Sequence, residues 1–321
     1  MAAGSHLDPL LQNLEFPHEA VFFPLGFPLV VRTNDPRVLE QAQTSWGMFT
    51  RLHAGAPLEL LVGVVDCSTA DLPPEPVTRA RRHLITVAGD SNHYGVTDFA
   101  AGVAICWTTP RAFDVAAHFR YFYLEAFGYM LVAERYLTAI HASCVISGRS
   151  CVLLCGPSGA GKSSLAYACA RRGWTYLADD ATFLVRSSPD LTVVGNCHRI
   201  RFRPDARVLF PELENFLEAP RPNGKMTIEV STNSLPIANA APTGEATHVV
   251  FLNRVDQGPA GCRPFDKDEA SRRLEAAFCY GRESSQREQR ASLSRLLDRD
   301  IFEITYSDLD PAVDALEALV R

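Results

Sequence analysis

The feature that most constrains this chain of 321 residues is a glycine-rich segment directly after a short apolar run. Residues 152–155 predict a buried strand, and residues 165–172 predict a helix that Gly173 ends with a left-handed cap. The segment between them fits the phosphate-loop pattern G-x-x-x-x-G-K-[ST]. It consists of Gly156, Pro157, Ser158, Gly159, Ala160, Gly161, Lys162 and Ser163, with Ser164 next. The order strand, loop, helix is the context that this motif requires. A glycine-rich turn without a ligand is the alternative.

The residue types of this phosphate-binding loop (P-loop, residues 156–163) explain its chemistry. Glycines let the backbone curl so that successive N–H groups point at one anion, and the helix N-terminus adds its positive end. The amine of Lys162 would reach the β- and γ-phosphates of a nucleotide, and the hydroxyl of Ser163 would ligate Mg²⁺. The motif therefore predicts ATP and Mg²⁺ as cofactors.

Composition restricts the partners and the compartment. The net charge of −6 and the isoelectric point of about 5.9 give no global basic field, so we expect no nucleic-acid partner. Nine scattered cysteines without a C-x-x-C pair are typical of a reducing cytoplasm rather than of a disulfide framework or a zinc site. The most apolar helical stretch, residues 121–133, is too short to span a bilayer, and no secretory signal is recognisable. We therefore expect a cytoplasmic protein without a membrane partner.

The length and the local patterns predict two domains. Residues 1–138 indicate a separate, smaller α+β domain with a helix that starts at Asn34-Asp35-Pro36. They also predict strands at 58–65, 83–87, 92–97 and 102–108, the last three as an antiparallel meander, and a long aromatic-rich helix at 110–137. Substrate recognition, oligomerisation and regulation are open as its role. Residues 139–321 predict an α/β P-loop domain with a mixed sheet.

An acidic pair follows the P-loop helix. Asp179 and Asp180 end the strand that residues 174–178 predict, where P-loop enzymes place an acid near the metal. A carboxylate there can bind Mg²⁺ or take a proton from an attacking hydroxyl group. A turn or a helix cap is the alternative for such a pair.

The P-loop, this acid pair and one histidine together resemble the catalytic domain of HPr kinase/phosphorylase, the bacterial enzyme that phosphorylates a serine of the phosphocarrier protein HPr. His141 lies fifteen residues before Gly156, and Asp180 lies seventeen residues after Ser163, and both spacings match that family. The resemblance covers about residues 139–230, with weaker similarity to about 320, and does not include residues 1–135. It implies a P-loop kinase domain of the type that forms the C-terminal part of that enzyme.

By this resemblance, Asp180 is the base in phosphoryl transfer, and His141 is its active-site neighbour. Lys162 and Ser163 bind the nucleotide and Mg²⁺, and Asp179 and Asp180 are the acidic candidates for the metal. Lys225 stands where the family has an arginine in a loop that closes on the phosphates; a solvated lysine at a strand end is the alternative.

Two departures from the family restrict the reaction. Ser164 stands where the bifunctional enzyme has glutamate, and the region 198–204 lacks the family's Glu-x-Arg-Gly-x-Gly motif. We therefore predict a one-way kinase with an acceptor other than HPr. Arg199, Arg201 and Arg203 alternate in this region, so a strand would place them on one face. They either clamp a phosphate or carboxylate of the substrate or form a solvated charged face.

The leading hypothesis is an ATP- and Mg²⁺-dependent kinase of a hydroxyl group, with serine of a peptide or small molecule as the acceptor. Relatives of this domain include serine kinases that accompany gene clusters for lasso peptides. A nucleotide-binding NTPase switch and a kinase of a nucleoside or sugar are the alternatives, and assembly into a homo-oligomer is open. The acid at the base position favours the kinase, and the absence of an obvious water-positioning glutamine counts against the switch.

Overall fold

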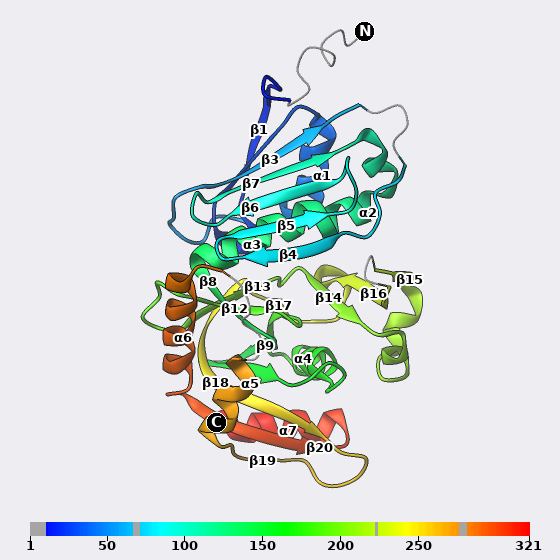
Figure 1. Ribbon diagram of the computed structural model, residues 1–321. Helices are drawn as coiled ribbons and strands as arrows, with labels where there is room; N and C mark the ends of the chain where they lie inside the picture. Colours follow the sequence, from blue (N-terminus) through cyan, green and yellow to red (C-terminus); the bar gives the residue numbers. More distant parts are fainter. Residues whose placement is uncertain (1–10, 67–70, 222–223, 276–280) are drawn as a thin grey trace. The chain divides into compact units, whose positions relative to one another are not determined.

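The computed structural model describes residues 11–66, 71–221, 224–275 and 281–321, and the chain divides into two compact units (Figure 1). The first unit is Met1–Arg135 and the second is Tyr136–Arg321. This division falls three residues before the boundary expected from the sequence. The reason is local: residues 137–140 form strand β8, which pairs with a strand of the second unit.

The first unit contains a seven-stranded mixed sheet with the order β1-β2-β3-β7-β6-β5-β4. Its strands are β1 (His18–Phe22), β2 (Leu29–Thr33), β3 (Leu58–Val64), β4 (Val77–Arg81), β5 (Leu84–Ala88), β6 (Tyr94–Asp98) and β7 (Val103–Thr108). β2 pairs with β3, and β3 with β7, in parallel. β5, β6 and β7 pair antiparallel, which confirms the predicted meander.

The helices of the first unit cover this sheet with aromatic side chains. α1 (Pro36–Trp46) begins where predicted, since the Asp35 carboxylate accepts a hydrogen bond from the Arg37 N–H. The expected helix at 110–137 is a run of a 3₁₀ turn (Pro110–Val115), α2 (Ala116–Phe119), a π-helical turn (Arg120–Glu125) and α3 (Ala126–Tyr136). Tyr123 and Phe127 on this run are fully buried. The aromatic density therefore builds the core of the unit.

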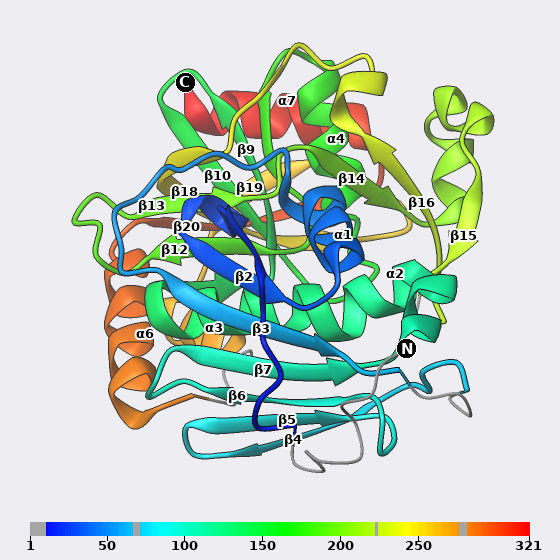
Figure 2. The same ribbon diagram turned by 90° about the horizontal axis from the view of Figure 1, so that it is seen from above.

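The second unit is an α/β structure around a ten-stranded sheet (Figure 2). The main order is β17-β11-β9-β10-β18-β13-β12-β8, and β20 pairs with both β18 and β19. Its strands are β8 (Leu137–Ile140), β9 (Ala142–Ser147), β10 (Ser150–Cys155), β11 (Thr175–Ala178), β12 (Thr182–Val185), β13 (Thr192–Gly195), β17 (Asn239–Ala240), β18 (Thr243–Arg254), β19 (Gly261–Pro264) and β20 (Asp300–Tyr306). A small sheet of β14 (Arg199–Phe202), β16 (Met226–Ser231) and β15 (Glu218–Pro220) completes it.

Two apolar layers enclose the central strand β10. Val152 and Leu154 face a core shared with α4 (Lys162–Arg171), α7 (Leu309–Val320) and the small sheet. Leu153 and Cys155 face a second core shared with α5 (Lys267–Glu275) and α6 (Glu283–Leu296). Because successive side chains of a strand point to opposite faces, a continuous apolar run gives a strand that is buried on both faces. The predicted α/β class with a mixed sheet is thereby confirmed.

The strand directions bring the predicted site residues to one edge of this sheet. β9 runs antiparallel to β10, and Ala142 at its start pairs with Cys155 at the end of β10. β11 runs antiparallel to β9, and Ala178 at its end pairs with Cys144. His141, the P-loop and the Asp179-Asp180 pair follow or precede these strand ends directly. Segments that are far apart in the sequence therefore meet at the mouth of the P-loop.

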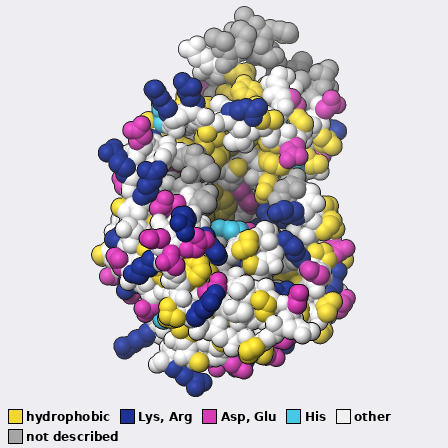
Figure 3. Space-filling model, turned by 60° about the horizontal axis from the view of Figure 1, so that its bottom comes forward, with side chains coloured by type: hydrophobic (Ala, Val, Ile, Leu, Met, Phe, Trp, Pro, Cys, Tyr) yellow, Lys and Arg dark blue, Asp and Glu magenta, His cyan; other side chains and the backbone are white. Residues whose placement is uncertain are grey.

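The described parts of the chain contain no helix that is long and apolar enough to cross a bilayer. On the face that Figure 3 shows, basic and acidic side chains are interspersed rather than separated into large regions of one sign.

Candidate active site

The P-loop has a backbone conformation that its glycines make accessible. Gly159 and Gly161 have φ angles of 92° and 94°, in the left-handed region that side chains disfavour. A Cβ atom on Gly161 would lie 2.6 Å from the Oη of Tyr306. The Tyr306 hydroxyl donates a hydrogen bond to the Ala160 carbonyl at 2.9 Å. The end of β20 therefore supports the loop from outside, a contact that no local sequence pattern indicated.

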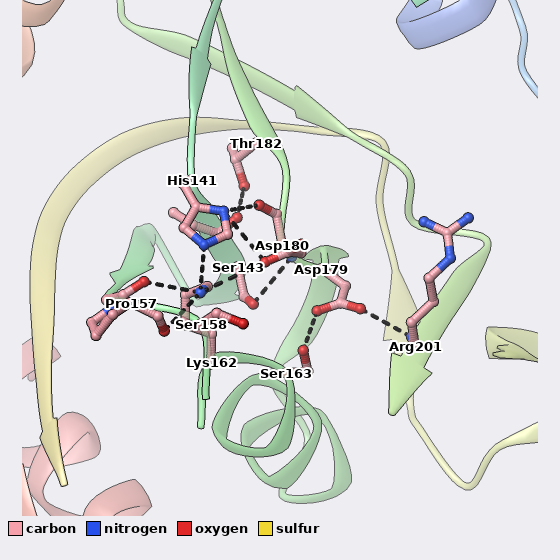
Figure 4. A network of polar contacts seen from close by, with 12 residues as sticks. His141, Ser143, Pro157, Ser158, Lys162, Ser163, Asp179, Asp180, Thr182 and Arg201 are labelled. Atoms are coloured by element: carbon pink, nitrogen blue, oxygen red, sulfur yellow. Dashed lines mark hydrogen bonds and ion pairs between the residues drawn. The ribbon is translucent and has the colours of Figure 1, made fainter. Parts of the chain in front are cut away.

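Lys162 is folded over the mouth of the loop (Figure 4). Its ammonium donates to the carbonyl oxygens of Gly156 at 2.9 Å and Pro157 at 3.3 Å. Its side chain is only 5% exposed, and Nζ lies 3.6 Å from the Asp180 carboxylate. A lysine this buried needs polar partners, and here the loop itself supplies them. The positive charge of Lys162 therefore lies where it would neutralise the negative charge of nucleotide phosphates.

His141 connects this lysine to the acid pair. Its Nε2 lies 2.9 Å from Lys162 Nζ, and its Nδ1 lies 3.1 Å from the Asp180 carbonyl oxygen. An ammonium can only donate, so Nε2 accepts and the ring proton is on Nδ1. Nδ1 also lies 3.3 Å from the Asp180 carboxylate. The imidazole thus contacts the lysine on one side and Asp180 on the other.

Asp179 is directed toward the P-loop helix. The Ser163 hydroxyl donates to one of its carboxylate oxygens, and the backbone N–H of Arg201 donates to the other at 2.9 Å. Loss of water around the half-buried carboxyl group raises the pKa of Asp179 above its ordinary value, and these two hydrogen bonds oppose that rise. A hydroxyl and a carboxylate side by side are the hard oxygen ligands that Mg²⁺ prefers.

Asp180 has a different environment from its neighbour. Its side chain is 63% exposed, and its φ angle of 60° is rare for a residue other than glycine. This backbone turns the carboxylate away from Ser163 and toward His141 and Lys162 (Figure 4). The two adjacent acids therefore present their carboxylates at two different points of the site, one at Ser163 and one at the open mouth.

The three alternating arginines separate into two groups. Arg199 and Arg201 on β14 both pair with Glu229 on the adjacent strand β16, at 2.7 and 2.5 Å. Arg203, just beyond β14, reaches the P-loop and donates to the Ser158 hydroxyl at 3.2 Å. The sequence pattern identified the shared face, but only the structure shows that the last of the three reaches the phosphate loop.

Lys225 lies in the turn between β15 and β16, where the backbone of Arg221 pairs with that of Lys225 across the turn. Two residues of this predicted loop, Pro222 and Asn223, lie outside the described residues. The proposed contact of Lys225 with phosphate stays a prediction. Ser164 lies in the first turn of α4, directly after Ser163.

The protein alone does not form a metal cage: within the described ranges, no group of three or more His, Cys, Asp or Glu side chains converges on one point. Mg²⁺ in phosphoryl-transfer sites is commonly held by one or two protein ligands together with the phosphates of the substrate. Ser163 and Asp179 fit that arrangement.

No protein-family model and no curated protein matches this chain. Among solved structures, the chain is similar to the Hpr(Ser) kinase/phosphatase from Coxiella burnetii, with 15% sequence identity and a TM-score of 0.32. The match covers 57% of this chain and 88% of the other. A similarity of this size does not identify an activity.

Proposed function

We propose that the second unit is a nucleoside-triphosphate- and Mg²⁺-dependent kinase that transfers the γ-phosphoryl group to a hydroxyl group. The observation that carries this proposal is the position of the Asp180 carboxylate, 3.6 Å from the P-loop lysine and exposed at the mouth of the loop. A base at this point can reach both a γ-phosphate and an acceptor that enters from solvent. ATP as the donor and a serine hydroxyl as the acceptor follow the family resemblance.

The step needs one base and several fixed charges. The acceptor oxygen attacks the γ-phosphorus, the bond from phosphorus to the β,γ-bridging oxygen breaks, and the acceptor proton passes to Asp180. Lys162 and Arg203 supply positive charge at the oxygens where negative charge develops. His141 keeps the lysine and Asp180 in their relative positions.

The metal has candidate ligands of its own. Ser163 and Asp179 would hold Mg²⁺, which neutralises phosphate charge when bound. The hydrogen bonds from Ser163 and from the Arg201 backbone direct the Asp179 carboxylate toward the P-loop helix, so an acceptor that enters from solvent would meet Asp180 first. Asp179 would therefore bind the metal, and Asp180 would accept the proton.

The test is transfer of labelled γ-phosphate from nucleoside triphosphates to a panel of acceptors that contains free serine, serine peptides, nucleosides and sugars. We expect Mg²⁺-dependent labelling of a hydroxyl group in at least one class, lost on chelation. Nucleotide hydrolysis at the same rate with and without every acceptor would instead indicate the NTPase switch.

A further inference from the structure

Asp180, the candidate base, lies at the centre of a tight three-residue turn. The Ala181 N–H donates to the Asp179 carbonyl at 2.6 Å, so the chain reverses around Asp180 alone. The φ angle of Asp180 is 60°, in the region that side chains disfavour. A turn that is closed by such an i to i+2 bond around a residue with positive φ is rare and strained. It persists only where the surrounding structure holds it.

This turn lies where the chain passes from one strand pairing to another. β11, before the turn, pairs with β9, whereas β12, after the turn, pairs with β8. His141 occupies the corresponding point of the other segment, between the end of β8 and the start of β9. Just beyond the crossing, Ile140 pairs with Thr182. The acid and its histidine therefore lie side by side because both segments change their pairing at the same place.

Hydrogen bonds from side chains connect the two segments at this crossing (Figure 4). The Thr182 hydroxyl donates to the Ala142 carbonyl at 2.8 Å. The Asp180 N–H donates to the Ser143 hydroxyl over a longer 3.5 Å, and Nδ1 of His141 lies 3.1 Å from the Asp180 carbonyl. Thr182 and Ser143 are fully buried, so the crossing is held by contacts within the protein. The bond from Thr182 is the shortest of the three.

We propose that Thr182 is a positioning residue for phosphoryl transfer, because it holds the strained turn that presents the Asp180 carboxylate at the mouth of the P-loop. Its hydroxyl bonds to a backbone carbonyl, so it acts on the base through the chain and not by direct contact. Without this bond the turn relaxes toward negative φ, which rotates the carboxylate away from its place beside Lys162. This inference rests on the proposed function, because it names a residue that positions the base of that reaction.

Thr182→Val tests the role because it removes the hydroxyl and keeps the branched shape of the side chain. A base that is misplaced by about 1 Å can lower turnover by about 10²-fold, so kcat should fall by about 10- to 100-fold. The KM for the nucleotide should change little, because Lys162 and Ser163 keep their contacts. Thr182→Ser restores the donor and should recover most of the turnover.

Thr138→Val is the matched control. Thr138 is also a buried threonine, on the strand β8 that pairs with β12, and its hydroxyl has no hydrogen-bond partner among the described residues. Its substitution should leave kcat at the wild-type value. A thermal melt of each variant accompanies the kinetics, since a merely structural role of Thr182 would lower the melting temperature without changing kcat below it.

A pair of substitutions at the turn itself tests the strain without any need for activity. Asp180→Gly and Asp180→Ala both remove the carboxylate, but only glycine adopts a φ of 60° without a steric penalty. Asp180→Gly should therefore melt at a higher temperature than Asp180→Ala. Arg290, which is exposed in the middle of α6, gives the reference: there the alanine variant should melt higher than the glycine variant.

The possible results separate this inference from the proposed function. Wild-type kcat in Thr182→Val, or an equal loss in Thr138→Val, overturns the positioning role and leaves the proposed kinase standing. Asp180→Gly that melts no higher than Asp180→Ala overturns the strained turn, and this comparison decides even where Thr182→Val does not fold. A wild-type chain that transfers phosphate to no acceptor overturns the proposed function and the positioning role with it.

Discussion

The amine of Lys162 lies 2.9 Å from Nε2 of His141, and the other ring nitrogen of the same histidine faces Asp180. One imidazole therefore contacts both the P-loop cation and the candidate base. Lys162 Nζ also lies 3.6 Å from the Asp180 carboxylate, so the cation, the imidazole and the acid form one group of mutual contacts. The histidine thus fixes the positions of the lysine and of Asp180 relative to one another.

Lys162→Ala should strongly reduce phosphoryl transfer while leaving the fold intact, because the loop backbone and its glycines remain. Removal of one preorganised charge-stabilising group typically lowers kcat by about 10²–10³-fold. The chain has three lysines, so Lys267→Ala on α5 is a matched control that should retain full activity. Steady-state kinetics at saturating nucleotide and a thermal melt of each variant are the measurements. Full transfer by Lys162→Ala would remove the P-loop from the mechanism.

The local part of the site could be predicted from the sequence. The pattern around Lys162 defined strand, loop and helix because glycine and lysine at these positions have few other uses. The spacing of His141 and Asp180 from the loop matched HPr kinase/phosphorylase, and that resemblance implied that both lie beside the loop. In the structure, the pairing of β9 with β10 and β11 brings them there.

Contacts between distant segments could not be predicted. Tyr306 supports the loop 146 residues after Ala160, and this contact depends on the register between β18 and β20. Arg203 reaches Ser158 only because the small sheet lies beside the P-loop helix, where Phe202 packs on Tyr167. The alternation of the three arginines predicted that they share one face of a strand. It did not predict that the end of this strand points Arg203 toward the P-loop. Such placements follow from packing, which short motifs do not encode.

Asp179→Asn should stabilise the fold at neutral pH while it weakens the response to Mg²⁺. Burial raises the folded-state pKa of Asp179, so its contribution to stability is complete below the unfolded-state pKa and is lost as the pH rises through the raised value. At neutral pH the buried carboxylate therefore destabilises the fold, and asparagine removes this destabilisation. The amide of asparagine can still form hydrogen bonds with Ser163 and with the Arg201 N–H. Melting temperatures of both proteins across acid to neutral pH should differ most at neutral pH and converge in acid. A less stable variant at neutral pH contradicts this account.

Arg203→Ala should lower kcat by about 10²-fold with little effect on stability, since its exposed guanidinium contacts the P-loop. Arg199→Ala is the matched control: it lies on the same face but pairs with Glu229. Turnover should remain near the wild-type value in the control. Equal losses in both variants would indicate that the whole arginine face binds substrate rather than Arg203 alone.

The reaction should run in one direction only. Ser164 stands where the bifunctional family has glutamate, and the sequence of β14 lacks that family's glycine-containing motif. Incubation of the phosphorylated product with inorganic phosphate and Mg²⁺ should therefore release no pyrophosphate. Pyrophosphate formed at a rate near that of the forward reaction would show that these two departures do not prevent phosphorolysis.

The two adjacent acids should differ in kinetic effect. Asp180→Asn preserves the shape of the side chain but removes the base, so kcat should fall by about 10²–10⁴-fold with little change in nucleotide affinity. Asp179→Asn should act through the metal, and excess Mg²⁺ should restore part of its activity. Transfer to the acceptor and hydrolysis without it are measured for both variants, with Asp190→Asn, in the turn between β12 and β13, as the control. If Asp179→Asn is inactive at every Mg²⁺ concentration and Asp180→Asn is near normal, the base is Asp179. If neither substitution matters, neither acid is the base, and the kinase proposal fails.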